Sequence, residues 1–181
     1  ANAPMYKSRR AATNIRQAVS ILGTHTVVII SLSFTLTNAL IKKTPSNQSA
    51  AFDSISFWRR SITTALASRA LGEKLGLKFL DDLFLAALIQ EIGILAFWVI
   101  LPEDYSKVFL SASDHDALLK AEREMFGSGH DELGYALLQK WHIPDYIALS
   151  CISSHSNPEP TSLGPTLQAC LAVSRYLADY I

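Results

Sequence analysis

An apolar run near the middle of the chain is the feature that most constrains its fold. Residues 83–95 read LFLAALIQEIGIL, in which large apolar side chains are interrupted by one polar pair, Gln90 and Glu91. A helix that is apolar on every face has to be surrounded by other elements, so the run predicts a buried central helix. The polar pair is unexpected there, because burying an amide and a carboxylate is costly unless both find partners.

Two segments are apolar enough to be compared with membrane-spanning helices. Residues 83–101 contain Gln90 and Glu91, and residues 27–41 are punctuated by Ser and Thr, whereas a spanning helix needs about 20 apolar residues. We therefore expect neither segment to cross a membrane. The first ten residues, ANAPMYKSRR, lack the long apolar core of a signal peptide.

The charge balance and the cysteines narrow the class of protein. Sixteen basic and sixteen acidic side chains give a formal net charge of zero, which offers no electrostatic footprint for nucleic acid or an anionic membrane. Cys151 and Cys170 lie in apolar helical contexts without close spacing, so we expect two small buried side chains in a reducing compartment. These features favour a cytoplasmic protein whose partners are neither nucleic acid nor membrane.

Capping and stop signals predict an all-α fold. Thr13 or Asn14 can cap a first helix that ends at Gly23, and a long helix is expected from Asp53 to Gly76. Apolar residues spaced four apart are expected to form one face of that long helix: Trp58, Ile62, Leu66 and Ala70. Further helices are expected over residues 27–41, 81–102, 114–126, 128–141, 144–155 and 166–180. These signals predict one domain of about seven or eight helices over residues 1–181.

The five histidines are the first candidates for catalytic or metal-binding residues. They occupy positions 25, 115, 130, 142 and 155. His130, in FGSGHDELG, lies at a helix start and His155, in CISSHSNP, near a helix end, where side chains can converge on a cleft. The alternative is that both are surface or capping residues, since no close spacing supports metal ligation. The pair His115-Asp116 looks like a metal motif, but we interpret it as the solvated first turn of a helix.

Several segments, taken in order, closely resemble the HDOD domain. They are ANAPMYKSRRAATNIRQAVSILG, FWRRSITTALASRALGEKLG, FLAALIQEIGIL, AEREMFGSGHDELGYALLQKWHIPDYI and SSHSNP. HDOD domains are bacterial output domains related to the HD superfamily of metal-dependent phosphohydrolases, so the resemblance implies an HD-like helical fold. Family members carry several helices before the ANAPMY-like motif, so we expect this chain to lack the front of the domain.

The resemblance also assigns positions to a metal site. Catalytic HD proteins ligate metal through a helical His, an adjacent His-Asp pair, later His residues and a final Asp, which activate a bound water. Carried over residue by residue, these positions in this chain are Arg60, Gln90, Glu91, His130, His155 and Ser174.

The departures from that pattern predict a degenerate site. Gln90 is a poor ligand, and Arg60 brings a permanent positive charge to the place of a dication. We therefore expect no catalytic residue, no metal and no cofactor, as the family implies. In their place we predict an ion pair between Arg60 and Glu91 with Gln90 hydrogen-bonded nearby; the alternative is that Arg60 points to solvent.

The resemblance implies a non-enzymatic signalling or regulatory module. Its partner would be a protein, an adjacent receiver, GGDEF or EAL domain of cyclic di-GMP signalling, or a small ligand. A nucleotide ranks below a protein, because the sequence has no phosphate-cradling motif. The rival interpretation is a metal-dependent nucleotide phosphohydrolase with Glu91, His130 and His155 as a reduced metal site.

Overall fold

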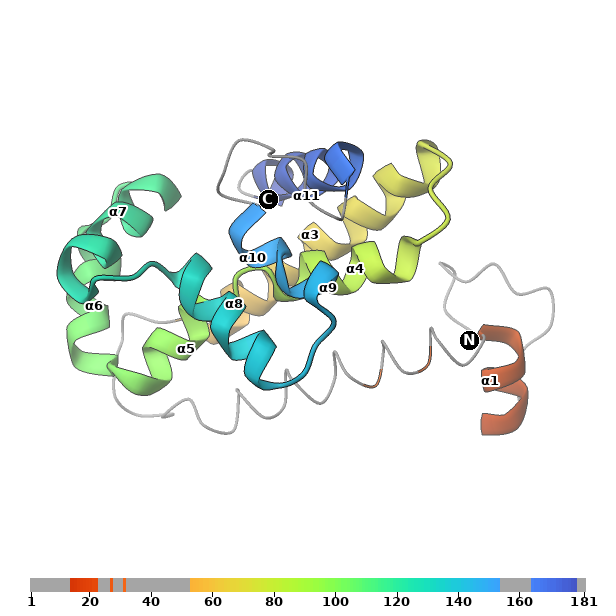
Figure 1. Cartoon of the computed structure of the whole chain (residues 1–181), viewed down its shortest axis with the longest axis horizontal. Coiled ribbons are helices and arrows are strands. Elements are labelled where there is room, and N and C mark those ends of the chain that lie inside the picture. The colour runs from red at the N-terminus through yellow and green to blue at the C-terminus, as the bar shows by residue number, and fades with distance from the viewer. Residues whose placement is uncertain (1–13, 23–26, 28–30, 32–52, 154–163, 179–181) are drawn as a thin grey trace.

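The computed structural model describes residues 14–22, 27, 31, 53–153 and 164–178. Every regular element among them is a helix, which confirms the predicted all-α fold (Figure 1). In chain order the longer helices are α1 (Ile15–Leu22), α3 (Ser54–Lys74), α4 (Leu80–Ile89), α5 (Ile92–Ile100), α6 (Pro102–Ser111), α7 (His115–Phe126), α8 (His130–Lys140) and α11 (Gly164–Ala178). Two single-turn helices, α9 (Asp145–Ala148) and α10 (Ser150–Ser153), follow α8. His25, His155 and most of the segment 27–41 lie outside the described residues.

Helix ends follow the predicted capping chemistry. The Asn14 side chain accepts a hydrogen bond from the backbone N–H of Gln17 at 2.9 Å, at the start of α1. Asp53 caps α3 by accepting from two backbone N–H groups, at 2.9 and 3.2 Å. Gly76 and Gly127 follow α3 and α7 with φ angles of 71° and 76°, the left-handed conformation that glycine adopts without strain.

The expected helix over residues 81–102 is divided in the structure. It ends as α4 at Ile89 and resumes as α5 at Ile92, with Gln90 and Glu91 between the two helices. Helix α6 was not predicted, because a proline after an apolar run commonly indicates the end of a helix. Proline instead occupies the first turn of α6, where its missing N–H costs nothing.

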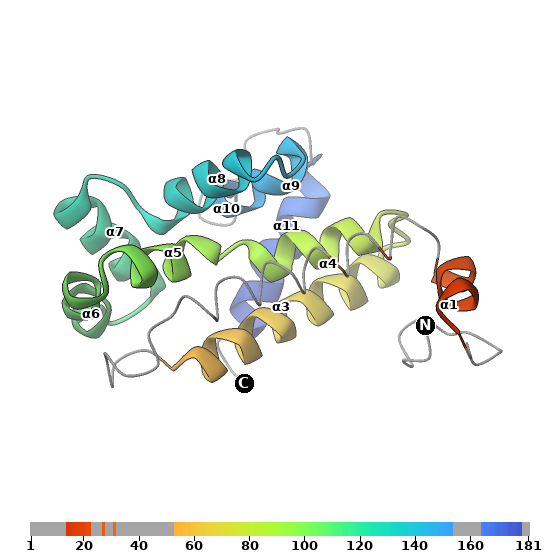
Figure 2. The ribbon, with the colours of Figure 1, turned by 90° about the horizontal axis from the view of Figure 1, so that it is seen from below.

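The face of α3 that carries its regularly spaced apolar residues is not the buried face. Ile62 and Leu66 are 47% and 45% exposed. The buried side of α3 carries small residues: Ser61, Thr64, Ala65, Ser68 and Gly72. Small side chains let α4 lie close alongside α3 (Figure 2), since a Cβ atom on Gly72 would lie only 2.7 Å from Leu83 Cδ2. Close approach of the helix backbones, and not apolar bulk, therefore determined which face is buried.

The apolar core has two parts that meet along α5. The first part centres on α4 and includes Cys151 and Cys170, which are buried as predicted. The second joins α5, α6 and α7, where the rings of Phe97 and Tyr105 stack with centroids 5.0 Å apart. The polar pair at the α4–α5 junction therefore lies between apolar residues of the first part, Ile89 and Ile92.

The central run has the length and composition of a membrane-spanning helix. The stretch Leu80–Ile100 meets both criteria, but 83% of its most apolar window is buried inside the protein. The rest of the domain covers this apolar surface, so the apolar composition of the run is accounted for by burial within the fold.

Two glycines bring α5 against the start of α8. A Cβ atom added to Gly93 would lie 1.8 Å from the backbone carbonyl oxygen of His130, so only glycine fits there. On α8, a Cβ on Gly134 would lie 3.2 Å from the Gly93 backbone nitrogen and 3.1 Å from the Cys151 sulfur. The contact places the first residue of α8 beside the α4–α5 junction.

Substitution of Gly93 by alanine is expected to destabilise the fold. The added methyl group meets backbone atoms that cannot rotate away, and overpacking of this kind costs about 1–3 kcal/mol. Chemical denaturation measures the change, with Gly134→Ala as the graded control, because its tightest neighbour is a side-chain sulfur. A Gly93→Ala protein as stable as the wild type would contradict the packing.

Candidate functional site

Gln90 and Glu91, at the break between α4 and α5, are 1% and 6% exposed. No described residue forms a hydrogen bond with Gln90 Oε1 or with either carboxylate oxygen of Glu91. A buried carboxylate with no hydrogen bond is unusual and costly in a folded protein. Within the described part of the chain, Gln90 Oε1 and the Glu91 carboxylate therefore lack the hydrogen bonds that would offset the cost of their burial.

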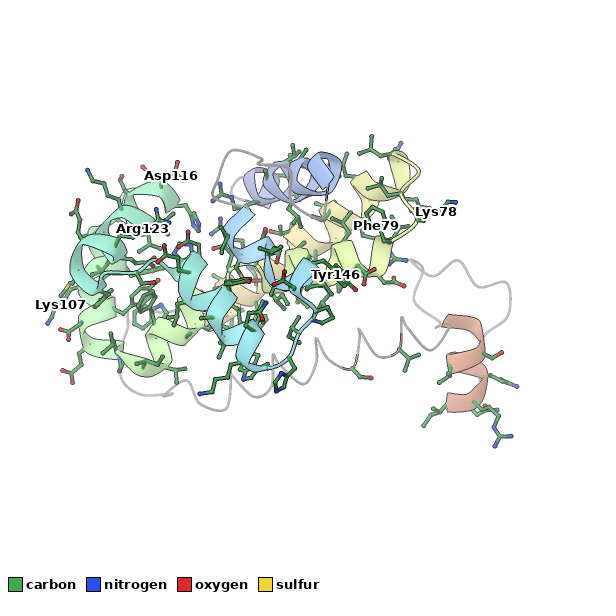
Figure 3. The ribbon with its side chains drawn as sticks, viewed as in Figure 1. Lys78, Phe79, Lys107, Asp116, Arg123 and Tyr146 are labelled. Carbon is green, nitrogen blue, oxygen red and sulfur yellow. The ribbon has the colours of Figure 1, made fainter. Side chains whose placement is uncertain are left out.

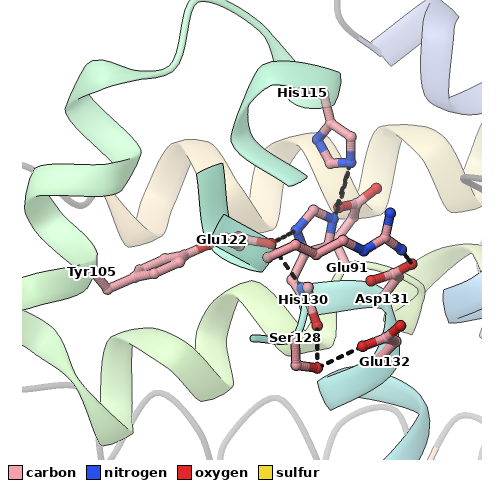
Figure 4. Close-up of polar contacts among 10 residues, drawn as sticks. Glu91, Tyr105, His115, Glu122, Ser128, His130, Asp131 and Glu132 are labelled. Carbon is pink, nitrogen blue, oxygen red and sulfur yellow. Dashed lines mark hydrogen bonds and ion pairs between the residues drawn. The ribbon is translucent and has the colours of Figure 1, made fainter. Parts of the chain in front are cut away.

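His130, the first residue of α8, is fully buried and held by Glu122 of α7 (Figure 4). Its ring Nδ1 lies 2.6 Å from Glu122 Oε2, and its backbone N–H donates to the same oxygen at 2.7 Å. The Tyr105 hydroxyl donates to Glu122 Oε1 at 2.6 Å. A carboxylate acceptor at Nδ1 favours the tautomer with the proton there, which leaves a lone pair on Nε2.

Burial keeps the Tyr105 hydroxyl protonated. Burial first, and then the charge of Glu122, raise the pKa of the Tyr105 hydroxyl. The tyrosine therefore remains a proton donor to Glu122 over the physiological range.

His115 enters the site from the first turn of α7. Its Nε2 lies 3.1 Å from His130 Nε2 and 3.4 Å from Glu91 Oε2, and its side chain is only 12% exposed. The interpretation of His115-Asp116 as a solvated turn is therefore wrong for His115 and right for Asp116, which is exposed on α7 (Figure 3). Capping by Asp114 leaves the next residue free to face either way, so sequence alone could not separate the two.

The surroundings of His115 keep its imidazole neutral. Burial lowers its pKa to about 2, and the nearby His130, Arg175 and Arg60 act in the same direction. Arg60 and His115 also line one pocket of about 390 Å³ together with Ile94, Phe109 and Leu118.

The contacts of Glu91 differ from those predicted for it. Its Oε2 lies 3.4 Å from His115 and 3.6 Å from His130, and neither of its oxygens accepts a hydrogen bond from a described residue. The expected ion pair with Arg60 is therefore not seen, and two imidazoles face the carboxylate instead. Arg60 is half-buried and lines the pocket, so it does not simply point to solvent.

The remaining predicted positions are only partly placed. Ser174 is fully buried on α11, and its hydroxyl has no hydrogen-bond partner among the described residues. His155 lies outside the described residues. Its role in the site, like that of Ser174, stays a prediction.

An ion pair fixes α7 and α8 relative to each other beside the site. The guanidinium of Arg123 donates to Asp131 Oδ2 at 2.6 Å, and the Asp131 side chain is almost fully buried. At the same helix start, the Ser128 hydroxyl donates to Glu132 at 2.8 Å. These contacts hold the first turn of α8, and hence His130, in place.

Among the described residues, one group of side chains has the chemistry and proximity to hold a metal ion. It consists of Glu91, His115 and His130, whose ligand atoms lie within 4.8 Å of one another. Sequence reasoning found two of the three. It missed His115, which is fifteen residues from His130 and reaches it only because α7 and α8 fold back on each other.

Comparison with protein families matches residues 1–158 to the HDOD domain. The chain belongs to the HDOD domain family. Among curated proteins, no match was found.

Solved structures show the same fold. The MmoQ response regulator from Methylococcus capsulatus str. Bath is 27% identical, with a TM-score of 0.64 over 99% of this chain and 69% of that chain. An HDOD domain protein from Geobacter sulfurreducens is 21% identical, with a TM-score of 0.75 over 97% of this chain and 58% of that one. The chain thus spans less than two thirds of the Geobacter protein, and that likeness shows the fold alone.

The neutral state of buried His115 predicts a pH dependence of stability. The unfolded chain binds a proton at His115 as the pH falls below 6.5, whereas the folded protein does not, so acid favours unfolding. In chelator-treated protein, the wild type should lose about 2 kcal/mol more than His115→Gln between pH 7 and pH 5. Urea unfolding at the two pH values measures this difference, and parallel losses in both proteins would contradict the buried placement of His115.

Proposed function

We propose that this HDOD domain is a non-enzymatic signalling module that acts by binding a partner. The observation that carries the proposal is the burial of the HD-type positions. The His130 side chain is 0% exposed, and both oxygens of Glu91 are buried. Hydrolysis at a metal requires the phosphate and the attacking water to reach the ion directly.

The substitutions at the site support the same conclusion. Gln90 replaces an imidazole ligand, and Arg60 places a fixed positive charge at another ligand position. Within the described part of the chain the site offers one group of three donors, Glu91, His115 and His130, which are few for the two-metal chemistry of phosphodiester hydrolysis. The likeness to the MmoQ response regulator supports a role in signalling.

The proposal also includes a kind of partner. A protein, or an adjacent signalling domain of receiver, GGDEF or EAL type, is the partner that the proposal favours. We place the module in the cytoplasm, where such domains and cyclic di-GMP meet. A small nucleotide ranks lower, because the sequence has no phosphate-cradling motif. Half of the residues that line the described pocket beside Arg60 are apolar: Ile94, Phe109, Ala112 and Leu118.

A phosphodiesterase assay tests the absence of catalysis. The purified chain and its His130→Ala variant are incubated with cyclic di-GMP and with bis(p-nitrophenyl) phosphate in Mn²⁺ and in Zn²⁺. Both proteins are expected to give the same rate as the buffer. Turnover by the wild type that His130→Ala abolishes would establish the rival function, a metal-dependent phosphohydrolase.

A further inference from the structure

We infer that Glu91, His115 and His130 bind one divalent transition-metal ion, best Zn²⁺, as a buried clamp between three helical segments. Its donor set differs from the HD pattern carried over onto this sequence, because His115 lies outside that pattern. The inference goes beyond the proposed signalling role and does not depend on it.

The distances between the three donor atoms match a tetrahedral metal site. His115 Nε2 and His130 Nε2 are 3.1 Å apart, and they lie 3.4 and 3.6 Å from Glu91 Oε2. Ligand atoms at about 2.0–2.1 Å from a tetrahedral Zn²⁺ are about 3.3–3.4 Å from one another. A point at about 2.0 Å from all three atoms therefore exists between them.

The orientation of His130 suits a metal ligand. Glu122 accepts a hydrogen bond from Nδ1, so Nε2 faces Glu91 and His115 with its lone pair (Figure 4). Metal-binding histidines commonly have a carboxylate on the second ring nitrogen, which fixes the ring and strengthens the donor. The Tyr105 hydroxyl fixes Glu122 in turn.

The carboxylate of Glu91 is the second, independent observation. Its side chain is only 7% exposed, and neither oxygen forms a hydrogen bond with a described residue. A metal ion at the point between the donors would supply the missing interaction.

Some of the charges near the cluster oppose the binding of a cation, and others favour it. Arg60 and Arg175 act electrostatically on His115 and oppose the binding of a cation. Glu91 and Glu122 are two buried carboxylates, and a dication would compensate both. Two imidazoles and one carboxylate favour Zn²⁺ and similar transition metals, whereas Mg²⁺ and Ca²⁺ prefer oxygen ligands.

The position of the cluster gives the ion a structural role. Glu91 lies between α4 and α5, and His115 and His130 lie in the first turns of α7 and α8. A bound ion would join these three segments across the interface between the two parts of the core.

Metal binding is tested with the tag-free chain after removal of metals by chelation. Elemental analysis after Zn²⁺ addition and dialysis is expected to give one equivalent, and Zn²⁺ should raise the melting temperature where Mg²⁺ does not. Co²⁺ is expected to give the visible absorption of a tetrahedral site. Less than a tenth of an equivalent of Zn²⁺, or equal stabilisation by Mg²⁺, would overturn the inference.

Matched histidine variants assign the ligands. His115→Asn is expected to weaken Zn²⁺ binding by roughly a hundredfold or more, because one of three protein donors is lost. His142→Asn is the control, because His142 is exposed and has a φ of 56°, which asparagine tolerates. Metal-free unfolding midpoints show whether each variant is folded. Equal Zn²⁺ affinity in folded His115→Asn and in the wild type would contradict the assignment.

Glu122 is expected to act as a positioning residue. Glu122→Gln keeps the side-chain size but weakens the hydrogen bond that His130 Nδ1 donates to residue 122. Zn²⁺ affinity should therefore fall by roughly 10–100-fold. The Co²⁺ spectrum should keep its tetrahedral form, because the three ligands are unchanged. Titration with a competing chelator measures the affinity, and unchanged affinity would contradict this role.

Discussion

The close contact between Gly93 and the backbone of His130 is the constraint on which the site depends. Because position 93 has no side chain, α5 packs directly against the first turn of α8. That contact places His130 beside Glu91, two residues before Gly93. Glu122 and the Arg123–Asp131 ion pair then fix α7 to α8, and α7 carries His115 into the same place. The glycine contact, the Glu122–His130 contact and the Arg123–Asp131 ion pair thus bring together residues from three segments of the chain.

The sequence predicted the fold class and several helix ends well, because these depend on local chemistry. Asp53 and Asp114 cap the helices that were expected to begin at these residues, since a cap needs only its own first turn. The buried face of α3 could not be predicted in this way. Periodicity selected Ile62 and Leu66, but burial depends on which face another helix can approach, and the small residues allowed α4 to come closer.

The candidate site shows the same division between local and long-range information. Resemblance to the family pointed to Gln90, Glu91 and His130, and all three are buried at the junction. The predicted partner of Glu91 was Arg60, yet two histidines face it in the structure. His115 was missed because its side-chain direction depends on the packing of α7 against α8. The neighbours of Glu91 thus depend on long-range packing, which no local pattern encodes.

A metal clamp and a signalling role without hydrolysis are compatible, because an ion bound between helices can stabilise one arrangement of them without taking part in a reaction. The most direct measurement is the anomalous scattering of a crystal of the zinc-loaded protein, recorded at the zinc absorption edge. The account predicts one strong peak at about 2.0–2.1 Å from Nε2 of His115 and His130, with Glu91 as the third protein ligand. The absence of a peak there, or a peak only at surface side chains, would contradict it.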